Sequence, residues 1–400
     1  MAMKPPLEFL EIRTWLQDRL PDFLEDLKTL VNVDCGTANK TGVDTVGRAF
    51  RELLLASGAK LREFPLDEFG NCCMATWYGS GEACIFLSGH LDTVFPDGTV
   101  AERPMKIKGS RILGPGVSDM KSGLLAGLYA VKGLQQIGYS NFAELRFFLN
   151  TDEETGSHTS RTLYQPLLRE ADAALVLESA RASGDIVSAR KGGADYRFEV
   201  HGRQAHAGVE IEKGANAIVE LARCIQELYA LNGRHPGTTV NVGVIGGGTV
   251  SNVVPDFAWA EVDARFVTCE AALILDENIR KIALQHTVPG TNIELSGGIE
   301  KRPMEKTTTT AYLVELAHGV GEKLGISFQD VLTGGTSDGN LIGELGVPVL
   351  DGLGPIGGLD HSPDEYLELE SIVPRTSLLA GLIASICENR RHLASIRVNE

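Results

Sequence analysis

Acidic side chains and histidines follow short apolar runs at several points of this 400-residue sequence. The residues that share this placement are His90, Asp92, Glu153, Glu154, Glu178 and His361. Carboxylates that converge on one place repel one another unless a cation neutralises them. Imidazole and carboxylate groups together suit zinc or a similar divalent metal. The pattern therefore predicts a metal site.

A further carboxylate, Asp119, lies in the turn Gly114-Pro-Gly-Val-Ser-Asp119, which precedes a helical stretch. Two metals about 3.5–4 Å apart need a bridging carboxylate, and five ligands of which one is shared are enough to hold both. A single histidine after a strand is usually structural, and a Glu-Glu pair is usually a solvated turn. Their joint occurrence is what indicates a metal centre.

The elements that position these residues alternate between strands and helices. Apolar runs that read as buried strands cover 84–87, 145–149, 173–177 and 347–350, and residues 123–134 between them have helical character. Residues 7–30 and 46–56 have apolar side chains at helical spacing. The order predicts an α/β fold with a mostly parallel sheet and helices on both faces. In such sheets, ligands bind beyond the carboxyl ends of the strands.

The middle of the chain has a different pattern. Alternating apolar and polar residues predict strands near 196–200 and 260–266, and residues 238–245 and 292–295 also read as strands. Helices are expected at 217–231 and 271–286. This β-α-β-β-α-β order is that of the split ferredoxin-like unit. We therefore expect a catalytic α/β domain formed by residues 1–193 and 305–400, with an inserted ferredoxin-like α+β domain at 194–304.

Composition excludes several classes of protein. The formal net charge of −16 argues against a nucleic-acid partner, and no apolar run reaches the roughly 18 residues of a membrane span. The seven cysteines are scattered, which is typical of a reducing compartment. The first 21 residues lack the apolar core of a secretory signal. We expect a cytoplasmic protein with no membrane partner.

The motifs together resemble one known family, the co-catalytic zinc exopeptidases and deacylases. They are His90-Leu-Asp92-Thr, Gly114-Pro-Gly-Val-Ser-Asp119, Asp152-Glu153-Glu154-Thr-Gly156, Glu178 and His361-Ser. The family includes glutamate carboxypeptidase, acetylornithine deacetylase, succinyl-diaminopimelate desuccinylase and aminoacylase. The resemblance covers nearly the whole chain and is strongest to the glutamate carboxypeptidase branch.

The resemblance implies a role for each of these residues. One zinc ion would be held by His90, Asp119 and Glu178, and a second by Asp119, Glu154 and His361, with cobalt or manganese as alternative metals. Glu153 would be the general base for the attacking water, and Asp92 would orient His90.

The resemblance extends to the inserted domain, which would dimerise the chain. His206 matches a family histidine that would assist catalysis, in relatives from the neighbouring subunit of a homodimer. Arg302, Arg265 and Asn252 match substrate-binding positions, and the backbone of Gly334 and Gly335 would face the substrate. Arg265 has a structural alternative as the ion-pair partner of Glu261 or Asp263. The implied activity is cleavage of an amide bond next to a free carboxylate in a small molecule or short peptide.

Other functions remain to be separated from this one. An N-acyl-amino-acid deacylase or desuccinylase would use the same machinery. A serine hydrolase is another alternative. The G-x-S-x-G motif that carries the nucleophile in such enzymes is matched by Gly335-Thr-Ser337-Asp-Gly339, and Asp360 and His361 follow it in the chain. Residues 352–357 match the letters of a nucleotide-binding loop, although no helix is expected after them. A metal-binding protein without hydrolytic activity would have no need for Glu153.

Overall fold

The computed structural model describes residues 9–398, and the chain divides into two compact units. Unit 1 comprises the chain up to Ser188, Lys306–Leu332 and the residues from Ser337 onward, whereas unit 2 comprises Ala189–Glu305 and Thr333–Thr336. Each unit has its own hydrophobic core. The sequence does not single out Thr333–Thr336 as part of the inserted unit.

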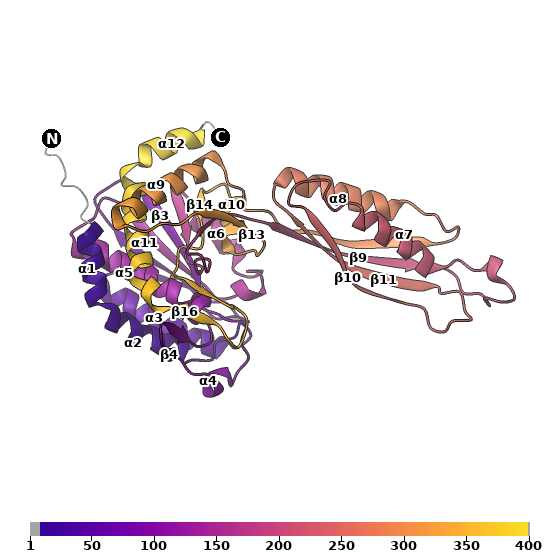
Figure 1. Cartoon of the computed structure of the whole chain (residues 1–400), viewed down its shortest axis with the longest axis horizontal. Coiled ribbons are helices and arrows are strands. Elements are labelled where there is room, and N and C mark those ends of the chain that lie inside the picture. Colours follow the sequence, from indigo (N-terminus) through magenta and orange to yellow (C-terminus); the bar gives the residue numbers. More distant parts are fainter. Residues whose placement is uncertain (1–8, 399–400) are drawn as a thin grey trace. The chain divides into compact units, whose positions relative to one another are not determined.

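A six-stranded sheet forms the centre of unit 1 (Figure 1). Its order is β1 (Lys60–Phe64), β2 (Cys72–Tyr78), β6 (Glu144–Asn150), β3 (Cys84–His90), β7 (Ala173–Val176) and β14 (Val349–Leu350). The last four strands run parallel, and β1 and β2 form an antiparallel edge. His90 pairs with Asn150, so β3 and β6 end side by side at one edge of the sheet.

Helices cover both faces of this sheet, which explains why its strands are continuous apolar runs. Ile85 and Leu87 of β3 belong to the main core, together with residues of α5 (Ser122–Gln136). Phe86 points to the opposite face, where its ring lies 6.3 Å from that of Tyr164 in α6 (Arg161–Leu167). The expected α/β fold with a mostly parallel sheet is confirmed.

Most of the remaining helices of unit 1 contribute residues to this core, and α4 (Thr99–Glu102) and α10 (Asp338–Glu344) lie outside it. The others are α1 (Phe9–Asp18), α2 (Leu20–Val31), α3 (Lys40–Ala56), α9 (Thr308–Leu324), α11 (Ile372–Glu388) and α12 (Arg390–Val398). The helix expected over 7–30 is two helices separated at Arg19, because Pro21 lies in the first turn of α2 and has no N–H to continue a helix. Residues 7 and 8 lie outside the described residues.

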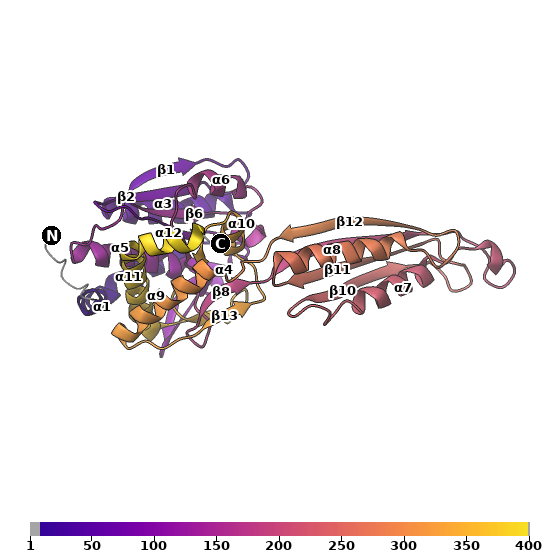
Figure 2. The same cartoon turned by 90° about the horizontal axis from the view of Figure 1, so that it is seen from above.

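One segment, Leu369–Glu388, is long and apolar enough to cross a membrane by length and composition. The segment is not an uninterrupted apolar run, because Glu370 and Arg375 lie within it, so it does not contradict the sequence expectation about apolar runs. In the fold, 78% of an 18-residue apolar window in this segment is buried, and α11 packs against α1, α5 and α9 (Figure 2). Its apolar character is accounted for by its place in the core.

Unit 2 has the element order β9 (Gly192–His201), α7 (Ala217–Tyr229), β10 (Thr239–Gly247), β11 (Phe257–Phe266), α8 (Cys269–Leu284) and β12 (Asn292–Lys301). The strands form an antiparallel sheet in the order β10-β11-β9-β12. Both helices lie on the same face of the sheet (Figure 1). The ferredoxin-like arrangement expected from the alternating pattern is confirmed.

Two smaller sheets complete the fold. One contains β15 (Gly357–Gly358), β16 (Tyr366–Glu368), β5 (Arg111–Leu113) and β4 (Lys106–Lys108), and the other pairs β8 (Ile186–Arg190) with β13 (Asp330–Thr333). The first sheet matters for the site, since β15 and β16 enclose the loop that contains His361.

Candidate metal centre

Five of the predicted ligands come together in two groups that share one carboxylate. The groups are His90, Asp119 and Glu178, and Asp119, Glu154 and His361, with the donor atoms of each group within 4.8 Å of one another. Nε2 of His90 lies 3.0 Å from Oδ1 of Asp119, and Nε2 of His361 lies 3.1 Å from Oδ2. Asp119 therefore presents one oxygen to each histidine, as a bridging ligand must.

The sheet positions three of these ligands at its carboxyl edge. His90 is the last residue of β3, the turn η2 (Glu153–Thr155) follows β6, and Glu178 follows β7. These strands are neighbours in the order β6-β3-β7. Parallel strands end at the same edge, which explains how residues far apart in sequence meet.

Asp119 reaches this edge from the short turn η1 (Val117–Lys121) that precedes α5. Gly123, in the first turn of α5, allows the helix to approach the end of β7 closely. A Cβ atom at that position would lie 1.9 Å from the carbonyl oxygen of Leu177. The glycine thus brings the beginning of α5, and Asp119 with it, next to Glu178.

His361 differs from the other ligands because it lies on a loop and its side chain is 56% exposed. Its φ of 63° is in the left-handed region, which few residues other than glycine adopt. Its Nε2 also lies 3.2 Å from Oε2 of Glu154. The backbone turn thus directs the imidazole into the cluster.

The electrostatics of the cluster favour a cation. Burial and the charge of Asp119 raise the pKa of Glu178 well above its usual value. Hydrogen bonds to Asp119 and Glu154 raise the pKa of His361 to about 11, and although burial opposes it, hydrogen bonds to Asp119 and Asp92 raise that of His90. The carboxylates therefore bind positive charge strongly, and the nitrogen and oxygen donors fit a divalent metal of the zinc type.

Asp92 lies behind His90 and is fully buried. Nδ1 of His90 is 3.0 Å from the backbone oxygen of Asp92 and 3.4 Å from its carboxylate. The other carboxylate oxygen accepts hydrogen bonds from Oγ1 of Thr37, at 2.7 Å, and from the backbone N–H of Glu154, at 3.2 Å. Asp92 therefore connects the orientation of His90 to the turn that holds Glu154.

Glu153 is half-buried in η2 and belongs to neither ligand group. Its charge contributes to the raised pKa of Glu178, so it lies near the cluster. Because Glu153 is not among the ligands of either group, it is a candidate for a chemical role other than metal binding.

Sequence analysis missed two buried carboxylates that support the cluster. Asp338 accepts hydrogen bonds from the side chains of Asn150, Ser157 and Tyr164 at 2.5–2.8 Å, and so anchors both sides of the Glu153-Glu154 turn. Glu365 accepts from backbone N–H groups of the Asp119 turn. For Glu365, its position four residues after His361 is the one available sequence signal.

Two of the remaining predicted site residues lie close together in unit 2. His206 is exposed, and its Nδ1 accepts a hydrogen bond from the N–H of Gly208 at 3.1 Å. The neighbouring N–H of Ala207 donates to the backbone oxygen of Asn252 at 3.0 Å. The structure therefore brings the segments of His206 and Asn252 side by side.

The predicted substrate-binding arginines and glycines are also in unit 2. Arg265 donates two hydrogen bonds to the carboxylate of Asp263, at 3.0 and 2.5 Å. This ion pair is the alternative to substrate binding that the sequence suggested. Arg302 is exposed just after β12. Gly334 and Gly335 lie in the Thr333–Thr336 segment, where the oxygen of Gly335 accepts from Nη1 of buried Arg190 at 3.0 Å.

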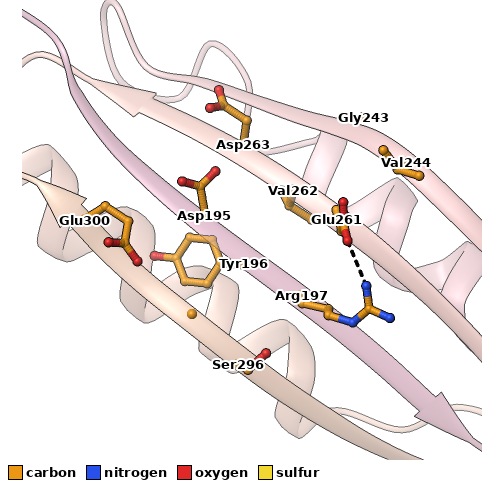
Figure 3. Close-up of a pocket in the computed structure, with 11 residues that line it drawn as sticks. Asp195, Tyr196, Arg197, Gly243, Val244, Glu261, Val262, Asp263, Ser296 and Glu300 are labelled. Carbon is orange, nitrogen blue, oxygen red and sulfur yellow. Dashed lines mark hydrogen bonds and ion pairs between the residues drawn. The ribbon is translucent and has the colours of Figure 1, made fainter. Parts of the chain in front are cut away.

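The open face of the unit 2 sheet carries a second set of charged residues, around a hollow of about 530 Å³ (Figure 3). Arg197 forms ion pairs with two glutamates: its Nε lies 2.7 Å from Oε1 of Glu199 and its Nη1 lies 2.8 Å from Oε1 of Glu261. Glu199, His201 and Glu294 also come within 4.8 Å of one another. Because Glu199 already has a cationic partner in Arg197, this group matches a metal centre less well than the clusters around Asp119.

The structure gives Ser337 a structural role. Its Oγ donates to Oδ2 of Asp351 at 2.6 Å and accepts from the N–H of Gly339 at 2.9 Å, as the N-cap of α10. The side chain is buried. A serine nucleophile needs an accessible oxygen and a histidine base. The oxygen of Ser337 is buried, and in the described part of the chain its hydrogen-bond partners include no histidine.

We therefore expect Ser337→Ala to remain active. Loss of the N-cap should lower the free energy of unfolding by about 1–2 kcal/mol, whereas kcat should stay within about threefold of wild type because no bond to the substrate is lost. Urea unfolding and initial rates on the same preparation measure both. Complete loss of turnover in a folded Ser337→Ala protein would restore the serine-hydrolase alternative.

The nucleotide-binding alternative also lacks its structural context. Residues 352–357 lead into the strand β15 rather than into a helix. A phosphate-binding loop of this type requires the N-terminus of a helix directly after the glycines. The glycine-rich segment instead adjoins the loop of His361.

Comparisons with known proteins agree with this geometry. Residues 86–385 match the model of peptidase family M20/M25/M40. The chain is 27% identical over 383 residues to carboxypeptidase G2 from Pseudomonas sp. (strain RS-16), covering 92% of this chain and 90% of that protein. It is also 27% identical over 393 residues to acetylornithine deacetylase from Myxococcus xanthus, covering 94% and 100%.

The fold is shared with solved structures. The aminopeptidase PepT of Bacillus cereus ATCC 10987 superposes with a TM-score of 0.80 at 23% identity, covering 92% of this chain and 98% of that one.

Proposed function

Because the chain belongs to peptidase family M20/M25/M40, we propose that it is a di-metal hydrolase that cleaves an amide bond next to a free carboxylate. The family makes the chain a metal-dependent peptidase or amidohydrolase. The observation that supports the finer proposal is the pair of ligand groups sharing Asp119, with Glu153 beside them.

Each residue of the cluster has a part in the proposed reaction. His90, Asp119 and Glu178 would hold one zinc ion, and Asp119, Glu154 and His361 the other. Bound there, two zinc ions would lower the pKa of a water molecule and polarise the amide carbonyl. Glu153 accepts the proton of that water and later donates it to the nitrogen of the leaving amine. Asp92 keeps His90 in the orientation that metal binding needs.

Residues of unit 2 complete the proposal. His206 would donate a hydrogen bond to the oxyanion that develops during attack, from the partner subunit of a homodimer. The substrate would be bound by the side chains of Arg302, Arg265 and Asn252 and by the backbone of Gly334 and Gly335. In this role Arg265 would bind the substrate while its guanidinium stays paired with Asp263. The proposed location is the cytoplasm, where all seven free cysteines stay reduced.

The proposed substrate class is a peptide-like conjugate with a C-terminal glutamate, which the resemblance to the glutamate carboxypeptidase branch implies; the similarity to carboxypeptidase G2 supports a carboxypeptidase. The similarity to acetylornithine deacetylase favours the second candidate, hydrolysis of an N-acyl amino acid. Both kinds of substrate have an amide next to a free carboxylate, so the same metal ligands and general base would serve either reaction.

A substrate panel tests the proposal. The protein is stripped with a chelator, reloaded separately with zinc, cobalt and manganese, and assayed on C-terminal glutamate conjugates and on N-acyl amino acids. We expect the stripped protein to lose at least about 10³-fold in rate, because metals contribute several kcal/mol of charge stabilisation, and to regain it on reloading. Preference for acyl-aspartate or acyl-arginine would contradict the glutamate assignment. Full activity after chelation would contradict the metal mechanism.

A further inference from the structure

Glu365 is buried beside the Asp119 turn, from a part of the chain 246 residues away. Its Oε2 accepts a hydrogen bond from the N–H of Gly116 at 2.8 Å. Its Oε1 accepts from the N–H of Ser118 at 2.8 Å and from that of Asp119 at 3.0 Å. One side chain thus satisfies three backbone donors of a single turn.

The turn needs an external acceptor because its backbone is irregular. Asp119 has φ −109° and ψ 94°, which is not helical, and α5 begins only at Ser122. The N–H groups of Gly116, Ser118 and Asp119 precede α5, where no earlier helical turn supplies acceptors for them. Since the turn is largely buried, these donors require a hydrogen-bond partner, and Glu365 supplies it.

The segment that carries Glu365 also contacts the side chain of Asp119, through His361. His361 lies four residues earlier, and its Nε2 is 3.1 Å from Oδ2 of Asp119. The loop between them is compact, since the N–H of Glu365 donates to the oxygen of Ser362 at 3.3 Å and the N–H of Ser362 to that of Leu359 at 3.1 Å. The backbone and the carboxylate of Asp119 are thus both held by residues 361–365.

We infer that Glu365 is a positioning residue that fixes the shared carboxylate of Asp119 and the imidazole of His361 relative to each other, and thereby sets the affinity for metal. The inference rests on the proposed function, because it assumes that Asp119 bridges two metals. A carboxylate is required at this position, since both of its oxygens accept hydrogen bonds. A glutamine would place an NH₂ group against at least one of the three N–H donors.

The test compares the full-length wild-type protein with Glu365→Gln. Zinc affinity is measured by competition with a chromogenic chelator. We expect at least one of the two sites to weaken by about 10–100-fold in Glu365→Gln, as for other residues that orient metal ligands. Turnover should fall at limiting zinc and recover substantially when zinc is raised, because affinity is what the substitution lowers. Glu370→Gln is the matched control, with the same exchange at an exposed position five residues later, and should bind as wild type does.

A purely structural role for Glu365 would give a different result. It would lower the melting temperature of the metal-free and the metal-loaded protein equally, whereas the inference requires the gain in melting temperature on adding zinc to be smaller in the variant. Should Glu365→Gln fail to fold, Glu365→Asp decides, because it keeps the charge but is one methylene too short to meet all three donors. A folded variant with unchanged zinc affinity overturns the inference and leaves the proposed function intact. A wild-type protein that binds fewer than two metals overturns the proposed function itself.

Discussion

Replacing Glu153 by glutamine is expected to lower kcat by about 10²–10⁴-fold while leaving two metals bound per chain. The amide cannot accept the proton of the attacking water, and proton transfer by a positioned side chain contributes a factor of this size. Metal binding should persist because Glu153 belongs to neither ligand group. Steady-state kinetics and elemental analysis of the same purified sample provide both measurements.

The kinetic constants distinguish the role of Glu153 from that of a substrate-binding residue. Loss of an interaction made only in the transition state lowers kcat and kcat/KM together and leaves KM nearly unchanged. Glu52→Gln, on an exposed turn of α3, provides the control for the exchange itself. Retention of the wild-type rate in Glu153→Gln would remove it as the base, and loss of a metal would identify it as a ligand.

Replacing Asp119 by asparagine is expected to affect both metals at once. Its two oxygens face different histidines, at 3.0 and 3.1 Å, whereas an asparagine has one oxygen and no charge. Metal ions contribute several kcal/mol to such reactions, and about 1.4 kcal/mol corresponds to a tenfold change in rate. We therefore expect the rate to fall at least about 10³-fold and less than one metal to remain per chain after gel filtration.

Glu178→Gln is the informative comparison for the Asp119 substitution. Glu178 belongs to one ligand group only, through its contact with His90 at 3.6 Å. We expect this variant to retain the metal of the other group, and so to have a metal content between those of wild type and Asp119→Asn. Equal metal content in both variants would contradict the assignment of Asp119 as the shared ligand.

The sequence alone determined the types of ligand and the elements that carry them. Short apolar runs ending at His90, Glu154 and Glu178 indicate parallel strands buried on both faces, and the alternating pattern of 194–304 indicates an antiparallel sheet with one exposed face. These signals are local, because burial of a strand or of one helix face is encoded in the spacing of neighbouring side chains. The break between α1 and α2 was missed, although Pro21 provides a local signal for it.

Only the tertiary structure decided which atoms meet. Nothing local shows that Asp119 presents one oxygen to His90 and the other to His361, or that Arg265 pairs with Asp263 rather than with Glu261. The role of Glu365 was not predictable from residue types either, since its partners are backbone N–H groups that every residue except proline possesses. Such bonds depend on where a distant segment passes, and the packing of the whole domain determines that path.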